Sequence, residues 1–114
     1  MQLLVEISSR KQTVAQKWTA AGARAFVEDA VKASGLTPFG DLALHEDAER
    51  VMAMQMIAES HIAVHLYLGA GRGYVDVFSC KNFDLPTMVG LVASSFCGKG
   101  SSLYPDVHDR GRLP

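Results

Sequence analysis

Two apolar segments, residues 60–68 and 72–80, are separated by only three residues, Gly69-Ala70-Gly71. A short glycine-containing connection between two such segments is typical of a β-hairpin. Tightly connected strands must run antiparallel, because parallel neighbours need a crossover of a dozen or more residues. The sequence therefore predicts an antiparallel sheet built around this hairpin.

Other parts of the chain are also predicted to be extended. Residues 2–7 and residues 51–58 are mostly apolar. The three methionines of the second segment recur at every second position, so they share one face of a strand. Their simplest interpretation is core filler. Two less regular segments complete the set: the broken stretch 36–44, and residues 101–104, an edge strand that Pro105 is expected to end.

Two helices are expected between these strands. Apolar residues recur at three- and four-residue steps through residues 13–34, with Gly35 as the stop signal. Residues 85–96 form the second, with Asp84 as N-cap and a glycine two residues past its end. This order predicts one α+β domain over residues 1–114, a two-layer sandwich with a mainly antiparallel sheet and two helices on one face.

Composition narrows the classes of function. The chain has 114 residues, of which 48% are hydrophobic and 20% charged, as in ordinary globular domains. Eleven basic and twelve acidic residues give a formal charge of -1, so no overall field attracts a nucleic acid or an anionic membrane. Two cysteines without a C-x-x-C pair indicate reduced thiols. We expect a cytoplasmic protein without a nucleic acid or membrane partner.

The densest group of reactive side chains lies at the start of the hairpin. If the turn is centred on Ala70, the two residue numbers of every cross-strand pair add up to 140. Asp76 then lies opposite Val64. A centre half a residue later gives a sum of 141 and places Asp76 opposite His65. Either register brings Cys80 close to Ser60, because cross-strand neighbours have Cβ atoms about 4.5–5.5 Å apart. A serine, a thiol and the two imidazoles of His61 and His65 are therefore expected to converge on one edge of the sheet.

Other interpretations of these residues stay open at this point. Ser60 and His65 are five positions apart, so a regular strand sends them to opposite faces, and direct contact needs a bulge. Ser60 could be a strand-end hydroxyl, and Cys80 a small buried hydrophobic residue. His61 and His65 share a face and could bind a metal, with Cys80 as the candidate third ligand, although these residues do not stand at a recognisable metal-site spacing.

The reactive segments also resemble a known family. Residues 58–65 read A-E-S-H-I-A-V-H, and residues 76–80 read D-V-F-S-C. They resemble the prokaryotic S-adenosylmethionine decarboxylases, which carry E-S-H-x-x-x-H and then D-x-F-x-C with this serine-to-cysteine separation. Residues 4–6 are similar to the first strand of that family, and residues 108–112, H-D-R-G-R, to its closing H-E-R-G-R.

The resemblance implies a proenzyme that cuts itself between Glu59 and Ser60, giving fragments 1–59 and 60–114. In such enzymes the serine hydroxyl attacks the preceding carbonyl and is finally converted to a pyruvoyl group at the new chain end. By the same resemblance, His65 is the base near the Cα proton of that serine. A hydroxyl is a weak nucleophile until a neighbouring group activates it.

The resemblance also implies the later chemistry. The pyruvoyl cofactor derived from Ser60 binds the substrate amine and accepts the electrons released when carbon dioxide leaves. Cys80 matches the proton donor of the family, and a thiol that is protonated at neutral pH can act as an acid. The family implies polyamine biosynthesis, and a homodimer or higher homo-oligomer of the processed chains.

Two motifs depart from the family pattern. The usual W-P-E after the second histidine is Tyr67-Leu68-Gly69, so only an aromatic residue, Tyr67, remains to contact an adenosyl group. The usual F-x-P-x-G-x-S is replaced by residues 46–52, E-D-A-E-R-V-M, which places Met52 where the family has a serine. Glu46 is a candidate for holding the distal cation of a smaller substrate. The alternatives are therefore the same mechanism on L-ornithine or L-arginine, or an unprocessed, catalytically silent dimer partner.

Overall fold

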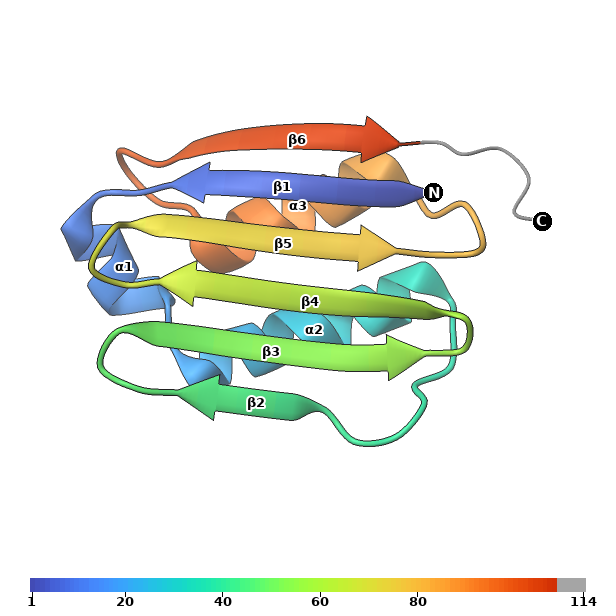
Figure 1. Cartoon of the computed structure of the whole chain (residues 1–114). Coiled ribbons are helices and arrows are strands. Elements are labelled where there is room, and N and C mark those ends of the chain that lie inside the picture. Colours follow the sequence, from blue (N-terminus) through green and yellow to red (C-terminus); the bar gives the residue numbers. More distant parts are fainter. Residues whose placement is uncertain (109–114) are drawn as a thin grey trace.

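The computed structural model describes residues 1–108, and the structural statements below concern that part of the chain. Its elements are β1 (Gln2–Ser8), α1 (Lys11–Lys17), α2 (Ala20–Ser34), β2 (Ala43–Glu46), β3 (Arg50–Ile57), β4 (Ser60–Tyr67), β5 (Arg72–Phe78), α3 (Leu85–Phe96) and β6 (Ser102–His108). The strands form one sheet in the order β2-β3-β4-β5-β1-β6, and all neighbours are antiparallel. Figure 1 shows the helices behind this sheet and its other face open. The predicted α+β sandwich is confirmed, with three helices rather than two.

The core lies between the sheet and the helices. On β4, every second residue is fully buried on the side of the helices: Ile62, Val64 and Leu66 are all 0% exposed. Phe26 of α2 and Phe96 of α3 meet above the sheet, with ring centroids 5.2 Å apart. Burial of such side chains is the main stabilising contribution, at about 1.5–3 kcal/mol for each large apolar residue. The strand period of two therefore places the buried residues of each strand on one face.

The helix predicted over residues 13–34 is in fact two helices, so this prediction is wrong at residues 18 and 19. Trp18 leaves the helical region, with φ -93° and ψ 77°, and its indole Nε1 donates to the carbonyl oxygen of Phe96 at 2.8 Å. Thr19 then begins α2 as its N-cap, accepting from the backbone N–H of Gly22 at 3.0 Å. The burial of Trp18 against α3 turns the chain, which the apolar periodicity does not reveal. Gly35 ends α2 as predicted, with φ 69°.

The methionine stripe of β3 is not part of the core. Met54 is 46% exposed and Met56 is 55% exposed, because this side of β3 belongs to the open face of the sheet. The other side, which carries Val51, Ala53 and Ile57, packs toward the helices and is buried. The sequence pattern correctly grouped the methionines on one face, but a period of two does not say which face a helix will cover.

The hairpin register also differs from both registers considered. The two residue numbers of each β4–β5 pair add up to 139. Asp76 therefore lies opposite Ala63, and His65 lies opposite Tyr74. The turn holds four residues, 68–71, because Leu68 leaves the β4–β5 ladder and its N–H donates to the carbonyl oxygen of Glu49 at 2.9 Å. Asp76 therefore faces neither Val64 nor His65.

The last strand is longer than predicted. It runs through Pro105, which lies opposite Val5 of β1, and continues to His108. The edge position of β6 explains this, because a proline is tolerated where its missing N–H would point away from the sheet. The residues from 109 onward, which include most of the H-D-R-G-R motif, lie outside the described part of the chain.

The break between α1 and α2 gives a first testable prediction. Thr19→Ala removes the side-chain oxygen that accepts from Gly22, and we expect a loss of about 1 kcal/mol in the free energy of unfolding. Thr19→Ser is the matched control, because it keeps the oxygen. Denaturant unfolding of the three proteins measures the effect, and equal stability of Thr19→Ala and Thr19→Ser would argue against the cap.

Candidate active site

Ser60 and Cys80 meet at one end of the sheet. Ser60 is the first residue of β4, directly after the two-residue β3–β4 turn formed by Ala58 and Glu59. The backbone N–H of Cys80, two residues past β5, donates to Ser60 Oγ at 2.9 Å. Cys80 Sγ lies 4.0 Å from the carbonyl oxygen of Ala58, a contact distance for a thiol donor. The predicted closeness of Ser60 and Cys80 is found, although the predicted registers are wrong.

The geometry around Ser60 suits a nucleophile that attacks its own chain. The carbonyl of Glu59 directly precedes Ser60; Glu59 lies in the two-residue turn, and Ser60 forms the end pair of the β3–β4 ladder with Ile57. A backbone N–H directed at Oγ stabilises negative charge developing on that oxygen. Ser60 and Cys80 are both half-buried, so the site is partly shielded from water without being closed.

A polar network follows Ser60 on the open face. His61 Nε2 contacts Asp76 Oδ2 at 3.0 Å, and Gln2 Nε2 donates to Asp76 Oδ1 at 3.0 Å. The His61 ring also stacks on Phe78, with ring centroids 5.7 Å apart. These contacts fix the start of β4 against β5 and β1. Sequence reasoning did not find this network, because it needs the true register, in which His61 lies opposite Phe78.

His65 is not brought to Ser60 within one chain. β4 pairs without interruption with both neighbours over this stretch, so no bulge moves His65 to the other face. Five residues of extended strand separate the two side chains by roughly 16 Å along the strand. His65 instead lies between Met52 of β3 and Tyr74 of β5, its direct cross-strand neighbours.

The surroundings of His65 form a second cluster on the open face. Tyr67, two residues further along β4, meets Tyr74 edge to face with ring centroids 6.0 Å apart. A shallow hollow of about 390 Å³ borders this cluster; its lining includes His65, Tyr74, Asp76, Glu6, Tyr104 and Asp106. The candidate residues therefore divide into two groups on one chain: Ser60 with Cys80, and His65 with Tyr67.

Comparison with known proteins identifies the family of the chain. The model of the family described as S-adenosylmethionine decarboxylase matches residues 1–110. The chain belongs to this family. The resemblance carried by the E-S-H-x-x-x-H and D-x-F-x-C motifs is thereby confirmed.

Two curated relatives support the same family. They are the S-adenosylmethionine decarboxylase proenzymes of Synechococcus sp. (strain WH7803) and Parasynechococcus marenigrum (strain WH8102). Each is 30% identical over 63 residues, which is 55% of this chain and 49% of the relative. The matched region thus spans about half the length of these relatives.

A solved structure shares the fold. The adenosylmethionine decarboxylase from Aquifex aeolicus VF5 superposes with a TM-score of 0.64 at 16% identity. The match covers 99% of this chain and 95% of that one. At this identity the comparison supports the architecture of the sheet and helices.

In this member of the family, the acids that replace the usual F-x-P-x-G-x-S motif serve the fold. Glu46 ends β2, and its Oε2 accepts from the backbone N–H of Ala20 at the start of α2, at 2.7 Å. It lies across the sheet from Leu66, by way of Val51, so roughly 20 Å of strand separates its position from that of Ser60. The structure thus does not bring Glu46 to the serine and the thiol.

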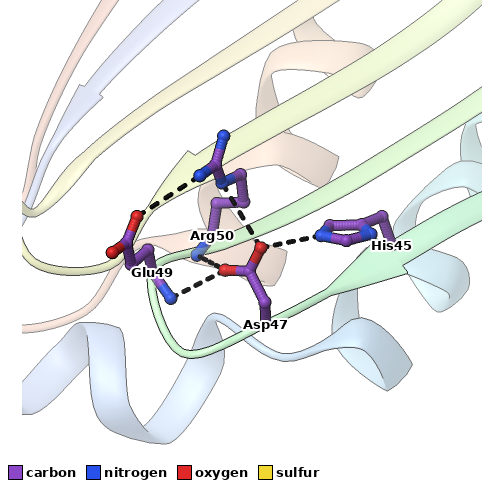
Figure 2. Close-up of polar contacts among 4 residues, drawn as sticks. All are labelled: His45, Asp47, Glu49 and Arg50. Carbon is purple, nitrogen blue, oxygen red and sulfur yellow. Dashed lines mark hydrogen bonds and ion pairs between the residues drawn. The ribbon is translucent and has the colours of Figure 1, made fainter.

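The neighbouring acids organise the β2–β3 turn, as Figure 2 shows. Asp47 Oδ1 accepts from the backbone N–H groups of Glu49 and Arg50 at 2.8 and 2.9 Å, while Oδ2 contacts His45 at 2.8 Å. The hydrogen bond with His45, aided by the two backbone donors and Arg50, lowers the pKa of Asp47 to about 2. Glu49 pairs with the Arg50 guanidinium at 3.3 Å.

The described part of the chain holds neither a metal-binding cluster nor a membrane-spanning helix. Residues 1–108 bring no group of three or more histidine, cysteine or acidic side chains together in a way that could hold a metal ion. None of the helices described here is long and apolar enough to cross a membrane. The second thiol, Cys97, lies at the end of α3, and burial raises its pKa.

The Asp47 turn predicts a defined pH dependence. The folded pKa of about 2 lies below the ordinary 3.8, so this carboxylate contributes stability above pH 3.8 that is lost as the pH falls toward 2. Asp47→Asn should therefore have a lower free energy of unfolding than the unchanged protein at neutral pH. This difference in free energy should become smaller between pH ~4 and ~2. Asp41→Asn, at an exposed carboxylate of the preceding loop, is the control, and denaturant unfolding at each pH is the measurement. A difference in the free energy of unfolding that does not change with pH would contradict the lowered pKa of Asp47.

Proposed function

We propose that this chain is a self-processing, pyruvoyl-dependent decarboxylase that acts on S-adenosylmethionine in polyamine biosynthesis. The hydrogen bond from the Cys80 N–H to Ser60 Oγ, beside the Glu59–Ser60 bond, is the observation that carries the proposal. Family membership adds the reaction class, since both curated relatives are S-adenosylmethionine decarboxylase proenzymes. The single domain over residues 1–114 would be cut into fragments 1–59 and 60–114.

Maturation would proceed through the backbone at Ser60. The hydroxyl oxygen bonds to the carbonyl carbon of Glu59, the C–N bond breaks, and the hydroxyl proton passes to the freed nitrogen. Loss of the Ser60 Cα proton expels the Glu59 carboxylate and leaves a carbon–carbon double bond. Hydrolysis then releases ammonia and leaves a ketone at residue 60. The Cys80 N–H holds the attacking oxygen at the start of this sequence.

The residues beside Ser60 fit a pyruvoyl group formed in place. Once formed, that group supplies an electron sink for the electrons freed by loss of carbon dioxide. Cys80 would then deliver a proton from Sγ to the substrate carbon, because its backbone is fixed against residue 60 and its thiol faces the β3–β4 turn. His61, anchored by Asp76, holds the new chain end in the sheet after the cut.

The separation of the two residue groups points to a homodimer in this proposal. Within one chain, His65 and Tyr67 lie too far along β4 to reach Ser60. The open face is also rich in exposed apolar side chains, including Met54, Met56 and Tyr74, which a second copy would cover. In such a pair, the partner's His65 would take the Cα proton at residue 60, and the partner's Tyr67 would contact the adenosyl group.

The other candidate substrates receive less support. L-ornithine and L-arginine require a group for a distal cation, for which Glu46 is the candidate. Its carboxylate instead accepts from the N-terminus of α2, and Asp47 is held by His45 and its own turn. A silent, unprocessed dimer partner remains a second candidate, because Met52 stands directly opposite His65 where the family has a serine.

Maturation itself is the decisive measurement. We expect the purified chain to give two fragments on a denaturing gel and a carbonyl that reacts with hydrazine reagents. Ser60→Ala should give one intact band without this carbonyl. Cys80→Ala keeps the backbone N–H on Ser60 Oγ, so it should still be cut, though more slowly, and should release carbon dioxide from S-adenosylmethionine at least tenfold more slowly. An uncut, carbonyl-free parent protein would leave the silent partner as the better account.

Mixed oligomers test the shared site. Ser60→Ala and His65→Ala should each process poorly alone, whereas their co-expression should restore cutting of the His65→Ala chain. The restored site would combine Ser60 of that chain with the partner's His65. A size tag on one chain identifies which is cut, and mass spectrometry of the purified mixture reports the extent. Absence of restored cutting in a proven mixed dimer would place His65 outside the proposed shared site.

A further inference from the structure

Glu59 has an unusual backbone conformation. Its φ is 61°, and within residues 1–108 it is the one residue other than glycine with a positive φ. Side chains with a Cβ rarely adopt this left-handed region, because Cβ then crowds the following carbonyl oxygen. Such outliers persist only where the surrounding structure holds them, and they gather at functional sites.

The chain before Glu59 is held from outside the hairpin. Ile57 forms an isolated bridge with Pro38, and the Ala58 N–H donates to the carbonyl oxygen of Thr37 at 3.2 Å. Segment 37–39 therefore restrains the incoming strand at the residue just before Glu59. This restraint prevents the turn from relaxing toward the β3 side.

The chain after Glu59 is held as well. Ser60 pairs with Ile57 in the β3–β4 ladder, and its Oγ accepts from the Cys80 N–H at 2.9 Å. Glu59 itself is exposed, so packing of its own side chain does not impose the conformation. The strain thus lies in the backbone and is imposed from both ends.

We propose that this strained conformation of Glu59 accelerates breakage of the Glu59–Ser60 bond, an inference that rests on the proposed self-processing. When Ser60 Oγ bonds to the Glu59 carbonyl carbon and the C–N bond breaks, the amide that forces Glu59 into the left-handed region is replaced by a longer ester link through Oγ, and elimination then removes that link as well. The strain present in the intact chain is therefore relieved as the reaction proceeds. After cutting, Glu59 is a chain end with free choice of φ.

Substitutions at residue 59 separate strain from side-chain chemistry. Glu59→Gly and Glu59→Ala both remove the carboxylate, but only glycine adopts positive φ without cost. We expect Glu59→Gly to mature about 5- to 30-fold more slowly than Glu59→Ala, the factor that corresponds to relief of about 1–2 kcal/mol at 1.36 kcal/mol per tenfold. Glu59→Asn should be intermediate, because asparagine tolerates this region better than alanine.

A glycine also makes a turn more flexible, so a flexibility control is needed. Ala58→Gly adds a glycine to the same turn without relieving a positive φ, and it should slow maturation less than Glu59→Gly. Stability gives an independent readout. In an uncleavable Ser60→Ala background, Glu59→Gly should unfold at higher denaturant concentration than Glu59→Ala. A merely weakened turn would instead lower both stability and maturation rate.

The outcomes distinguish the two proposals. If the parent chain is never cut, the proposed function fails and the strain has no reaction to assist. If the parent chain is cut but Glu59→Gly matures as fast as Glu59→Ala, self-processing stands and the role of strain is overturned. Slower maturation together with higher stability of the uncleavable glycine variant supports it.

Discussion

The pairing of β4 with strands on both sides determines where Ser60, His65 and Tyr67 lie and which of them meet Cys80. β3 and β5 hold β4 in fixed register from its first residues to Tyr67, so the chain has no freedom to bend or bulge there. This pairing sets Ser60 beside Cys80 at one end and commits His65 to the open face. The buried residues Ile62, Val64 and Leu66 secure the register, because a slip of one residue would expose all three.

The fold class and the closeness of Ser60 and Cys80 could be predicted from the sequence. In a short hairpin, an error of one or two residues in the predicted register still leaves these two residues near each other. The sequence was not sufficient for features that depend on distant contacts. The indole of Trp18 bonds across to α3 and breaks the helix there. The side of β3 that carries Met54 stays open because α2 packs on the other side, a choice that strand alternation cannot reveal.

The same limit applies to the site. The roles suggested for Glu46 and His65 came from position in a motif, whereas their surroundings come from tertiary structure. Glu46 sits where a helix N-terminus offers an unpaired N–H, so its carboxylate joins the scaffold. His65 lies in an aromatic and apolar environment that one chain leaves exposed. A motif can therefore be intact in sequence while its members lie at separate places on the molecule.

The strand order has one more consequence. Strands β1, β2 and β3 precede residue 60, while β4, β5 and β6 follow it, and yet β1 lies between β5 and β6. A backbone break after residue 59 would give two polypeptides that interleave in one sheet rather than two halves placed side by side. If one left, the other would keep only one pair of neighbouring strands, β2–β3 or β4–β5, and β1 would lose both its ladders. Separation would require the β3–β4, β1–β5 and β1–β6 ladders all to break, so the cut molecule should persist as one cooperative unit.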